Sequence, residues 1–121
     1  ALHMVAPSAD DERMLSALAT AGLTAGDSAL PKGLDTQVFD MRTGVSVGQM
    51  RRISLARALL LERPLLLLDE PTAGLDSVAS GHIARAVRTQ ADAGVTVVVI
   101  THGDEFDLVA DRVVDVEAVM V

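Results

Sequence analysis

The chain has 121 residues, half of them hydrophobic, and it carries a formal net charge of −7 with no cysteine. This length and hydrophobic fraction predict one compact unit rather than a disordered segment. The negative charge argues against general nucleic-acid binding, which needs clustered lysine and arginine, and the lack of cysteine excludes disulfide and thiolate chemistry. No apolar run reaches the length that spans a bilayer, so any role at a membrane is expected to go through a partner.

The first segment predicts a tail followed by a helix. Residues 1–8 lack the basic start and apolar core of a signal peptide, and we interpret them as an N-terminal tail, with a cloning remnant as an open alternative. Ser8 precedes three acidic residues, a pattern that favours a helix start, so a helix is predicted over residues 9–21. Its expected apolar stripe consists of Met14, Leu15 and Leu18.

A loop is predicted over residues 24–43, where glycine and proline interrupt any regular pattern. A short extended piece is expected near residues 36–39. Lys32, the only lysine, lies in this loop without the glycines and the Ser or Thr of a P-loop, so a solvated surface charge is predicted.

A second helix is predicted from Ser46 to the residues before Pro64. Ser46 is a favourable N-cap, and apolar residues then recur at helical spacing. The free N–H groups of this helix start, beside a serine hydroxyl and Gly48, could cradle a phosphate. An ordinary capped helix explains the same residues, and the segment alone does not separate the two interpretations.

Four leucines at residues 65–68 predict a strand buried on both faces, because a half-exposed strand would alternate apolar and polar residues. Asp69 and Glu70 follow where this strand must emerge. In an open parallel sheet the ligand crevice lies at the carboxyl ends of the strands, so a nucleotide site is one interpretation and a core strand with an acidic turn is the other.

The next segments predict a parallel crossover. A helix capped by Asp76 or Ser77 is followed by a β-branched strand at residues 95–100. Because the ends of parallel strands share one edge, His102 is expected on the edge that carries Asp69 and Glu70. A short helix over residues 104–110 and a third strand over residues 112–116 complete the prediction.

Five motifs in this order resemble those of the ATP-binding cassette (ABC) family. They lie at residues 45–49, 52–60, 65–71, 73–76 and 101–102. The resemblance covers residue 9 to the C-terminus, the later part of such a domain, and implies an α/β fold. Residues 9–63 would be a portion of the helical subdomain with the signature motif, and residues 64–121 a partial RecA-like P-loop NTPase core of parallel strands with flanking helices. Residues 30–36 resemble the exporter branch, and residues 69–76 resemble the thiol exporters that assemble bacterial cytochrome bd.

The resemblance assigns roles to individual residues. Asp69 would hold magnesium, Glu70 would activate the attacking water, and His102 would contact the γ-phosphate. A second group would bind ATP held by the opposite subunit: Ser46, Val47, Gly48, Gln49 and Asp76. The implied cofactors are ATP and Mg²⁺, and the implied function is ATP hydrolysis coupled to transmembrane export. The implied partners are a second nucleotide-binding domain and a transmembrane domain on the cytoplasmic side of the inner membrane, with no nucleic acid.

Two features depart from the family pattern. Val47 replaces the expected signature glycine, so a branched side chain faces any approaching phosphate. The sequence also contains no G-x-x-x-x-G-K-[ST], so we interpret it as a fragment that is inactive by itself. Its strand edges would lack a common partner strand, and we expect direct pairing, strand exchange or self-association to cover them.

Two other functional classes fit the same motifs. One is the late lobe of an SMC-type or repair ATPase, which would follow a long coiled coil. The other is a non-catalytic interaction module that has kept the fold. Sequence upstream of the chain would distinguish these alternatives.

Overall fold

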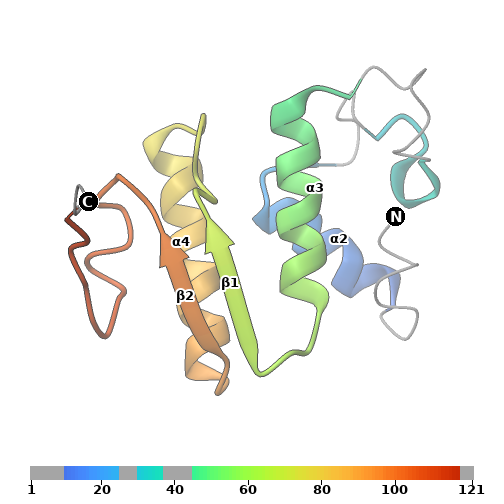
Figure 1. The fold of residues 1–121 in the computed structure, drawn as a ribbon. Helices are drawn as coiled ribbons and strands as arrows, with labels where there is room; N and C mark the ends of the chain where they lie inside the picture. Colours follow the sequence, from blue (N-terminus) through green and yellow to red (C-terminus); the bar gives the residue numbers. More distant parts are fainter. Residues whose placement is uncertain (1–9, 25–29, 37–44, 118–121) are drawn as a thin grey trace.

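The computed structural model describes residues 10–24, 30–36 and 45–117 (Figure 1). In chain order the elements are α2 (Asp11–Thr20), the 3-10 turn η1 (Gly33–Asp35), α3 (Val47–Leu60), β1 (Leu65–Asp69), α4 (Ser77–Asp92) and β2 (Thr96–Ile100). The two strands pair in parallel and α4 connects them, which confirms the predicted α/β class. None of the helices in these ranges is long and apolar enough to cross a bilayer.

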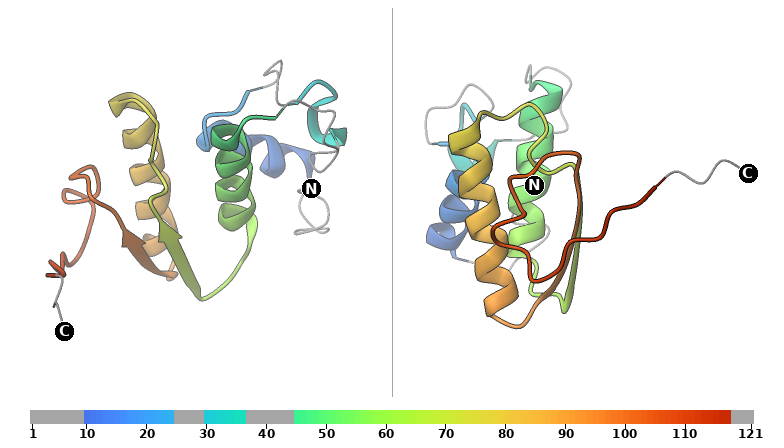
Figure 2. Two further views of the ribbon diagram at one scale, coloured as in Figure 1. Left: turned by 45° about the horizontal axis from the view of Figure 1, so that its top comes forward. Right: turned by 90° about the vertical axis from the view of Figure 1, so that its left-hand side faces the viewer.

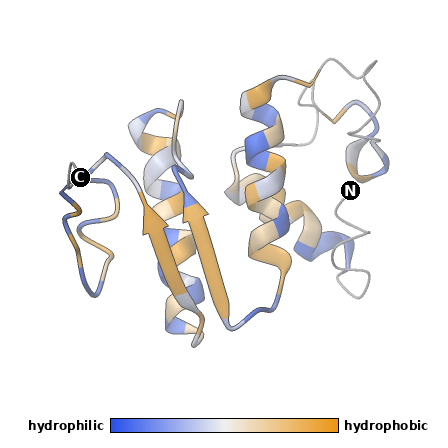
Figure 3. Cartoon of the chain, in the orientation of Figure 1, coloured by the Kyte–Doolittle hydropathy of each residue, from blue (hydrophilic) through white to orange (hydrophobic). Residues whose placement is uncertain are grey.

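The sheet has one covered and one open face. Helix α4 runs alongside the two strands (Figure 2), and Leu66, Val97 and Val99 pack against the core on that side. The opposite face exposes apolar side chains, including Leu67, which is 64% exposed. The prediction that β1 is buried on both faces is therefore wrong, because none of the described elements covers the second face. Both strands are strongly apolar along their length (Figure 3).

Three helices begin with a side-chain cap. Asp10 Oδ1 accepts a 2.8 Å hydrogen bond from Arg13 N at the start of α2, which corrects the prediction that Ser8 marks the helix start. Asp76 Oδ1 accepts a bond of the same length from Ala79 N and fixes the start of α4. Ser46 caps α3, as predicted. These caps satisfy backbone donors that helix geometry leaves unpaired.

The core forms where α2 packs on α3 and where α4 packs on the sheet. Met14 and Leu18 are buried, but Leu15 is 45% exposed, so one residue of the predicted α2 stripe lies outside the core. The largest side chains that are fully buried are those of Met14, Leu23 and Ile83. At the end of α2, Gly22 adopts a φ of 83°, the left-handed conformation that glycine takes without steric cost.

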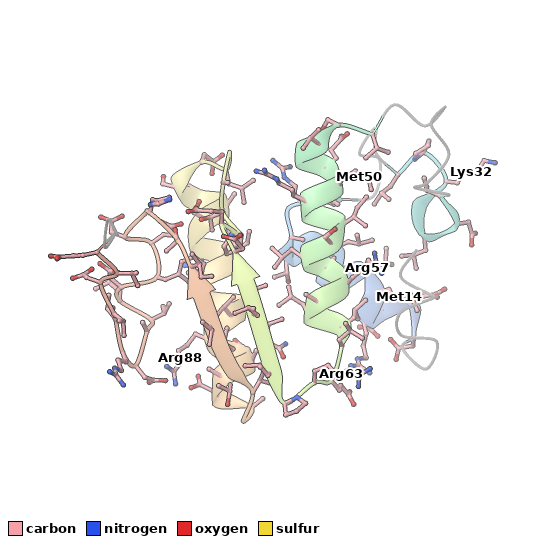
Figure 4. All side chains as sticks on the ribbon, viewed as in Figure 1. Met14, Lys32, Met50, Arg57, Arg63 and Arg88 are labelled. Atoms are coloured by element: carbon pink, nitrogen blue, oxygen red, sulfur yellow. The ribbon has the colours of Figure 1, made fainter. Side chains whose placement is uncertain are left out.

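The loop predictions are only partly covered by the described residues. Lys32 is exposed and projects away from η1 (Figure 4), in agreement with a solvated charge. Its backbone N donates a 3.0 Å hydrogen bond to Thr36 Oγ1. Thr36 has extended backbone, and the rest of the extended piece predicted near residues 36–39 lies outside the described residues.

Two predictions for the C-terminal segment are wrong. Residues 104–110 form turns rather than a helix. Most of their backbone hydrogen bonds join residues three apart, as in a turn, such as Val109 N to Phe106 O at 3.0 Å. Residues 112–117 are exposed and form no strand, because they do not pair with the free edge of either described strand. Direct pairing of this segment with β2 is therefore absent. Arg88 from α4 (Figure 4) instead anchors the preceding turn, donating to Val109 O at 3.1 Å and to Asp111 Oδ1 at 2.8 Å.

Two residues of α4 provide a test of this core. We expect Ile83→Ala to lower the free energy of unfolding by about 2–5 kcal/mol, because it removes buried methyl groups and leaves a cavity. Val78→Ala on the same helix should change it by less than about 0.5 kcal/mol, because Val78 is 68% exposed. Urea unfolding followed by circular dichroism measures both, and equal losses would contradict this description of the core.

Candidate catalytic edge of the sheet

The register of the two strands brings Glu70 and His102 together. Asp69 lies beside Ile100 at the ends of β1 and β2. Glu70 N extends this pairing by donating a 2.8 Å hydrogen bond to Ile100 O. Two residues later His102 Nε2 lies 3.4 Å from Glu70 Oε1. The prediction that His102 emerges on the same edge as the acidic pair is confirmed.

Glu70 has an unusual backbone and an open acceptor. Its φ of 47° lies in the left-handed region, which a non-glycine residue occupies at a cost of about 1 kcal/mol or more. Oε1 is buried, and despite its closeness to His102 it accepts no hydrogen bond from the described residues. The His102 side chain is 97% exposed, so packing does not hold it in place. Because the Glu70 side chain as a whole is 35% exposed, its carboxylate remains accessible to an external donor such as water, although Oε1 itself is covered.

Asp69 points to the open face of the sheet. It is exposed at the carboxyl end of β1, in the same alternation that exposes Leu65 and Leu67. Within the described ranges no group of three or more His, Cys, Asp or Glu side chains could hold a metal ion. A cation at Asp69 would therefore need further oxygen ligands besides clustered side chains of these types. Mg²⁺ commonly binds in this way, through one or two carboxylates, waters and substrate phosphates.

The remaining predicted site residues lie at helix starts. Ser46 Oγ accepts from Gln49 N at 3.2 Å, while Gln49 Oε1 accepts from Ser46 N at 2.9 Å, a reciprocal capping box. Val47 is 75% exposed at the first position of α3, and Gly48 is also exposed. Asp76 caps α4 and lines a cavity of about 250 Å³ between the end of α2 and the start of α4. The starts of α3 and α4 lie at the same end of the molecule as the strand ends (Figure 1).

A third carboxylate, which the sequence analysis did not identify, joins the two strand exits. Glu105 Oε1 accepts hydrogen bonds from the Thr72 hydroxyl and from Thr101 Oγ1, the latter at 3.3 Å. Gly103 N donates to Thr101 Oγ1 at 3.1 Å. Glu105 was predicted to be part of a short helix, and its only sequence signal is that it is a carboxylate three residues after His102.

Hydrogen bonding sets the charge state of this carboxylate. The bond from Thr72 lowers the pKa of Glu105 below its ordinary value of 4.5, and partial burial opposes the shift. A folded-state pKa below the unfolded value means that the interaction stabilises the fold above pH 4.5. This contribution is lost as the pH falls through the lowered pKa.

Comparison with known proteins identifies the family. The family model described as ABC transporter matches residues 3–73, which is more than half of the chain. The chain belongs to the ABC transporter family. This membership confirms the resemblance predicted from the motifs, although the match ends before Asp76 and His102.

Individual relatives extend the similarity over most of the chain. The ATP-dependent lipid A-core flippase of Paraburkholderia xenovorans (strain LB400) is 38% identical over 110 residues, which cover 91% of this chain and 18% of the flippase. The glutathione/L-cysteine transport system ATP-binding/permease protein CydD of Escherichia coli (strain K12) is 38% identical over 96 residues, 79% of this chain and 16% of CydD. The chain thus spans less than a fifth of these transporters. The match to a glutathione and cysteine transport protein agrees with the thiol exporter branch predicted from the motifs.

The Thr72–Glu105 hydrogen bond can be tested by titration. Thr72→Val keeps the side-chain shape but removes the hydroxyl donor, so the pKa of Glu105 should rise toward 4.5. Carboxyl ¹³C NMR of the 121-residue chain, recorded between pH 7 and pH 3, measures the midpoint directly. Thr89→Val, at an exposed position of α4, is the matched control and should leave the midpoint unchanged. An unshifted midpoint in Thr72→Val would refute the assigned bond.

Proposed function

We propose that this chain supplies part of the ATP-hydrolysing domain of an ABC exporter. The observation that carries the proposal is the 3.4 Å approach of His102 Nε2 to Glu70 Oε1 at the carboxyl ends of two parallel strands. The names of the relatives support it, since both describe transport and one states ATP dependence. Because the chain spans only part of their length, the activity, substrate and partners of the whole protein belong to the proposal.

Glu70 is proposed as the general base. Its side chain is 35% exposed and its Oε1 has no hydrogen-bond donor among the described residues, so the carboxylate can accept the proton of a water molecule that attacks a phosphate. The His102 ring is 97% exposed and lies close to this carboxylate, so it can donate a hydrogen bond to the terminal phosphate. Glu70 and His102 lie at the same edge of the sheet, so this edge can bind both the attacking water and the phosphate.

Asp69 is proposed as the magnesium ligand. Its exposed carboxylate at the end of β1 fits a cation whose other ligands are water and phosphate oxygens. When bound, Mg²⁺ would neutralise negative charge on the triphosphate. The placement of Asp69 on the open sheet face keeps its oxygens accessible and apart from the buried oxygen of Glu70.

A second set of residues is proposed to bind the triphosphate of an opposite subunit: Ser46, Val47, Gly48, Gln49 and Asp76. Ser46 Oγ accepts a bond from Gln49 N, which leaves its own hydroxyl hydrogen for donation to a phosphate oxygen. The positive end of the α3 dipole favours the same anion. We therefore propose a second nucleotide-binding domain and a transmembrane domain as partners, at the cytoplasmic side of the inner membrane, with no nucleic acid.

Glu70→Gln in the full-length protein tests the general base. The substitution keeps the side-chain shape but removes the basic oxygen, so the ATPase rate should fall roughly 10²–10⁴-fold while ATP binding persists. Glu117→Gln makes the same chemical change at an exposed position and should leave the rate unchanged. A near-normal rate in Glu70→Gln would remove Glu70 from this role.

Calorimetry on the 121-residue chain tests whether this chain needs a phosphate-binding loop from elsewhere to bind ATP. The sequence contains no G-x-x-x-x-G-K-[ST], whose backbone amides and lysine cradle the phosphates in P-loop proteins. We expect this chain alone to bind Mg-ATP weakly and to hydrolyse it negligibly. Micromolar affinity or steady turnover would show that the described edge binds nucleotide without such a loop.

A further inference from the structure

We infer that Glu105 is a positioning residue that holds the Glu70–His102 pair in place by tying together the exits of β1 and β2. The structural part of this inference stands on the hydrogen bonds alone. Its catalytic consequence rests on the function proposed above.

The two strand exits are linked by Glu105 where the sheet ends. The backbone pairing of β1 and β2 finishes with Glu70 N and Ile100 O. Beyond that bond, no backbone hydrogen bond joins residues 71–76 to residues 101–110, all of which are described. The side chain of Glu105 spans this gap, because a single carboxylate oxygen accepts from threonines on both segments.

The two threonines are the neighbours of the pair. Thr72 lies two residues after Glu70 and is only 6% exposed, so its hydroxyl is fixed in the interior. Thr101 directly precedes His102, and it also accepts a bond from Gly103 N on the other side of the histidine. The residues on both sides of His102 are thus joined through Thr101 Oγ1. This hydroxyl is in turn hydrogen-bonded to Glu105.

The Glu70–His102 pair depends on these hydrogen bonds because its own contacts do not fix it. The His102 side chain is 97% exposed, and its approach to Glu70 lacks hydrogen-bond geometry. Neither burial nor a direct hydrogen bond therefore fixes the 3.4 Å separation. The separation between the two side chains therefore depends on where the His102 backbone lies relative to Glu70.

A substitution at Gly103 provides a second way to disturb the hydrogen bonds of Glu105. A Cβ at this position would overlap the Glu105 carboxylate, with Cδ only 2.9 Å away. A glycine here lets Glu105 fold back onto the strand exits. Gly103→Ala should displace the carboxylate while keeping its charge, because the end of a flexible side chain is the part that can move.

The first measurement uses kinetics of the full-length protein. Glu105→Ala should lower kcat on the order of 10-fold to 100-fold with KM nearly unchanged, because misplaced catalytic groups slow the reaction without removing a substrate contact. Glu105→Gln retains an acceptor oxygen and should recover most of this loss. Asp107→Asn, an exposed carboxylate in the same segment, is the charge-matched control and should have no effect.

The second measurement reports on geometry without reference to activity. The ring ¹⁵N resonances of His102 in the full-length protein should shift in Glu105→Ala and in Gly103→Ala, but little in Glu105→Gln or Asp107→Asn. If Glu105→Ala fails to fold, Gly103→Ala and Thr101→Val still test the same link. In a double-mutant cycle Thr72→Val should add little to Glu105→Ala, since both remove one interaction.

The outcomes separate this inference from the proposed function. Unshifted His102 resonances in both Glu105→Ala and Gly103→Ala overturn the inference, whatever the rates. Unchanged kcat in Glu105→Ala, with Glu70→Gln inactive, removes its catalytic consequence. Shifted resonances together with a fully active Glu70→Gln would instead sustain the positioning role and overturn Glu70 as the base.

Discussion

The parallel register of β1 against β2 is the constraint on which the rest of this structure depends. It sets Asp69 beside Ile100, and the next backbone bond fixes Glu70 at the exit of the sheet. A slip of one residue would move His102 along the strand by about 3.3 Å and reverse the faces of every side chain. The apolar residues that pack on α4 oppose such a slip, because Val97 and Val99 would be exchanged for their exposed neighbours.

Negatively charged carboxylates and the positive ends of helix dipoles both lie at the polar end of the sheet. Asp69, Glu70 and Glu105 bring negative charge to the strand exits. The N-termini of α3 and α4, where helix dipoles are positive, lie at the same end of the molecule (Figure 1). Ser46 and Asp76 already occupy donors of these helix starts with their own oxygens. The end of the molecule thus offers both acceptors for a cation and donors for an anion, a combination that suits a metal–phosphate ligand.

Sequence reasoning identified the features that depend on local and repeating patterns. The capped start at Ser46, the strand leading to Asp69 and the return of His102 to the same edge follow from capping chemistry, hydrophobic runs and the geometry of parallel strands. The roles assigned to these residues are predictions that neither the geometry nor the comparisons test. The same holds for the division into a helical portion at residues 9–63 and a core portion at residues 64–121.

The failures concern features that depend on distant neighbours. Leucine content predicted a β1 strand covered on both sides, but coverage depends on which elements are present, and α4 supplies only one layer. Residues 112–116 have strand-like composition, yet a strand forms only where another backbone offers hydrogen bonds. Glu105 was missed for the same reason, because its partner Thr72 is 33 residues away and is brought to it by the crossover.

The left-handed backbone of Glu70 has a consequence for how this position changes over evolutionary time. With a φ of 47°, the site prefers glycine or asparagine on steric grounds alone, so a glutamate there acts against the local conformational preference, as the proposed role of its carboxylate would require. Conformational preference and chemistry therefore act in opposite directions on one residue. A lineage that no longer uses the carboxylate should drift toward glycine or asparagine at this position faster than at its neighbours, and the residue found there would record the loss.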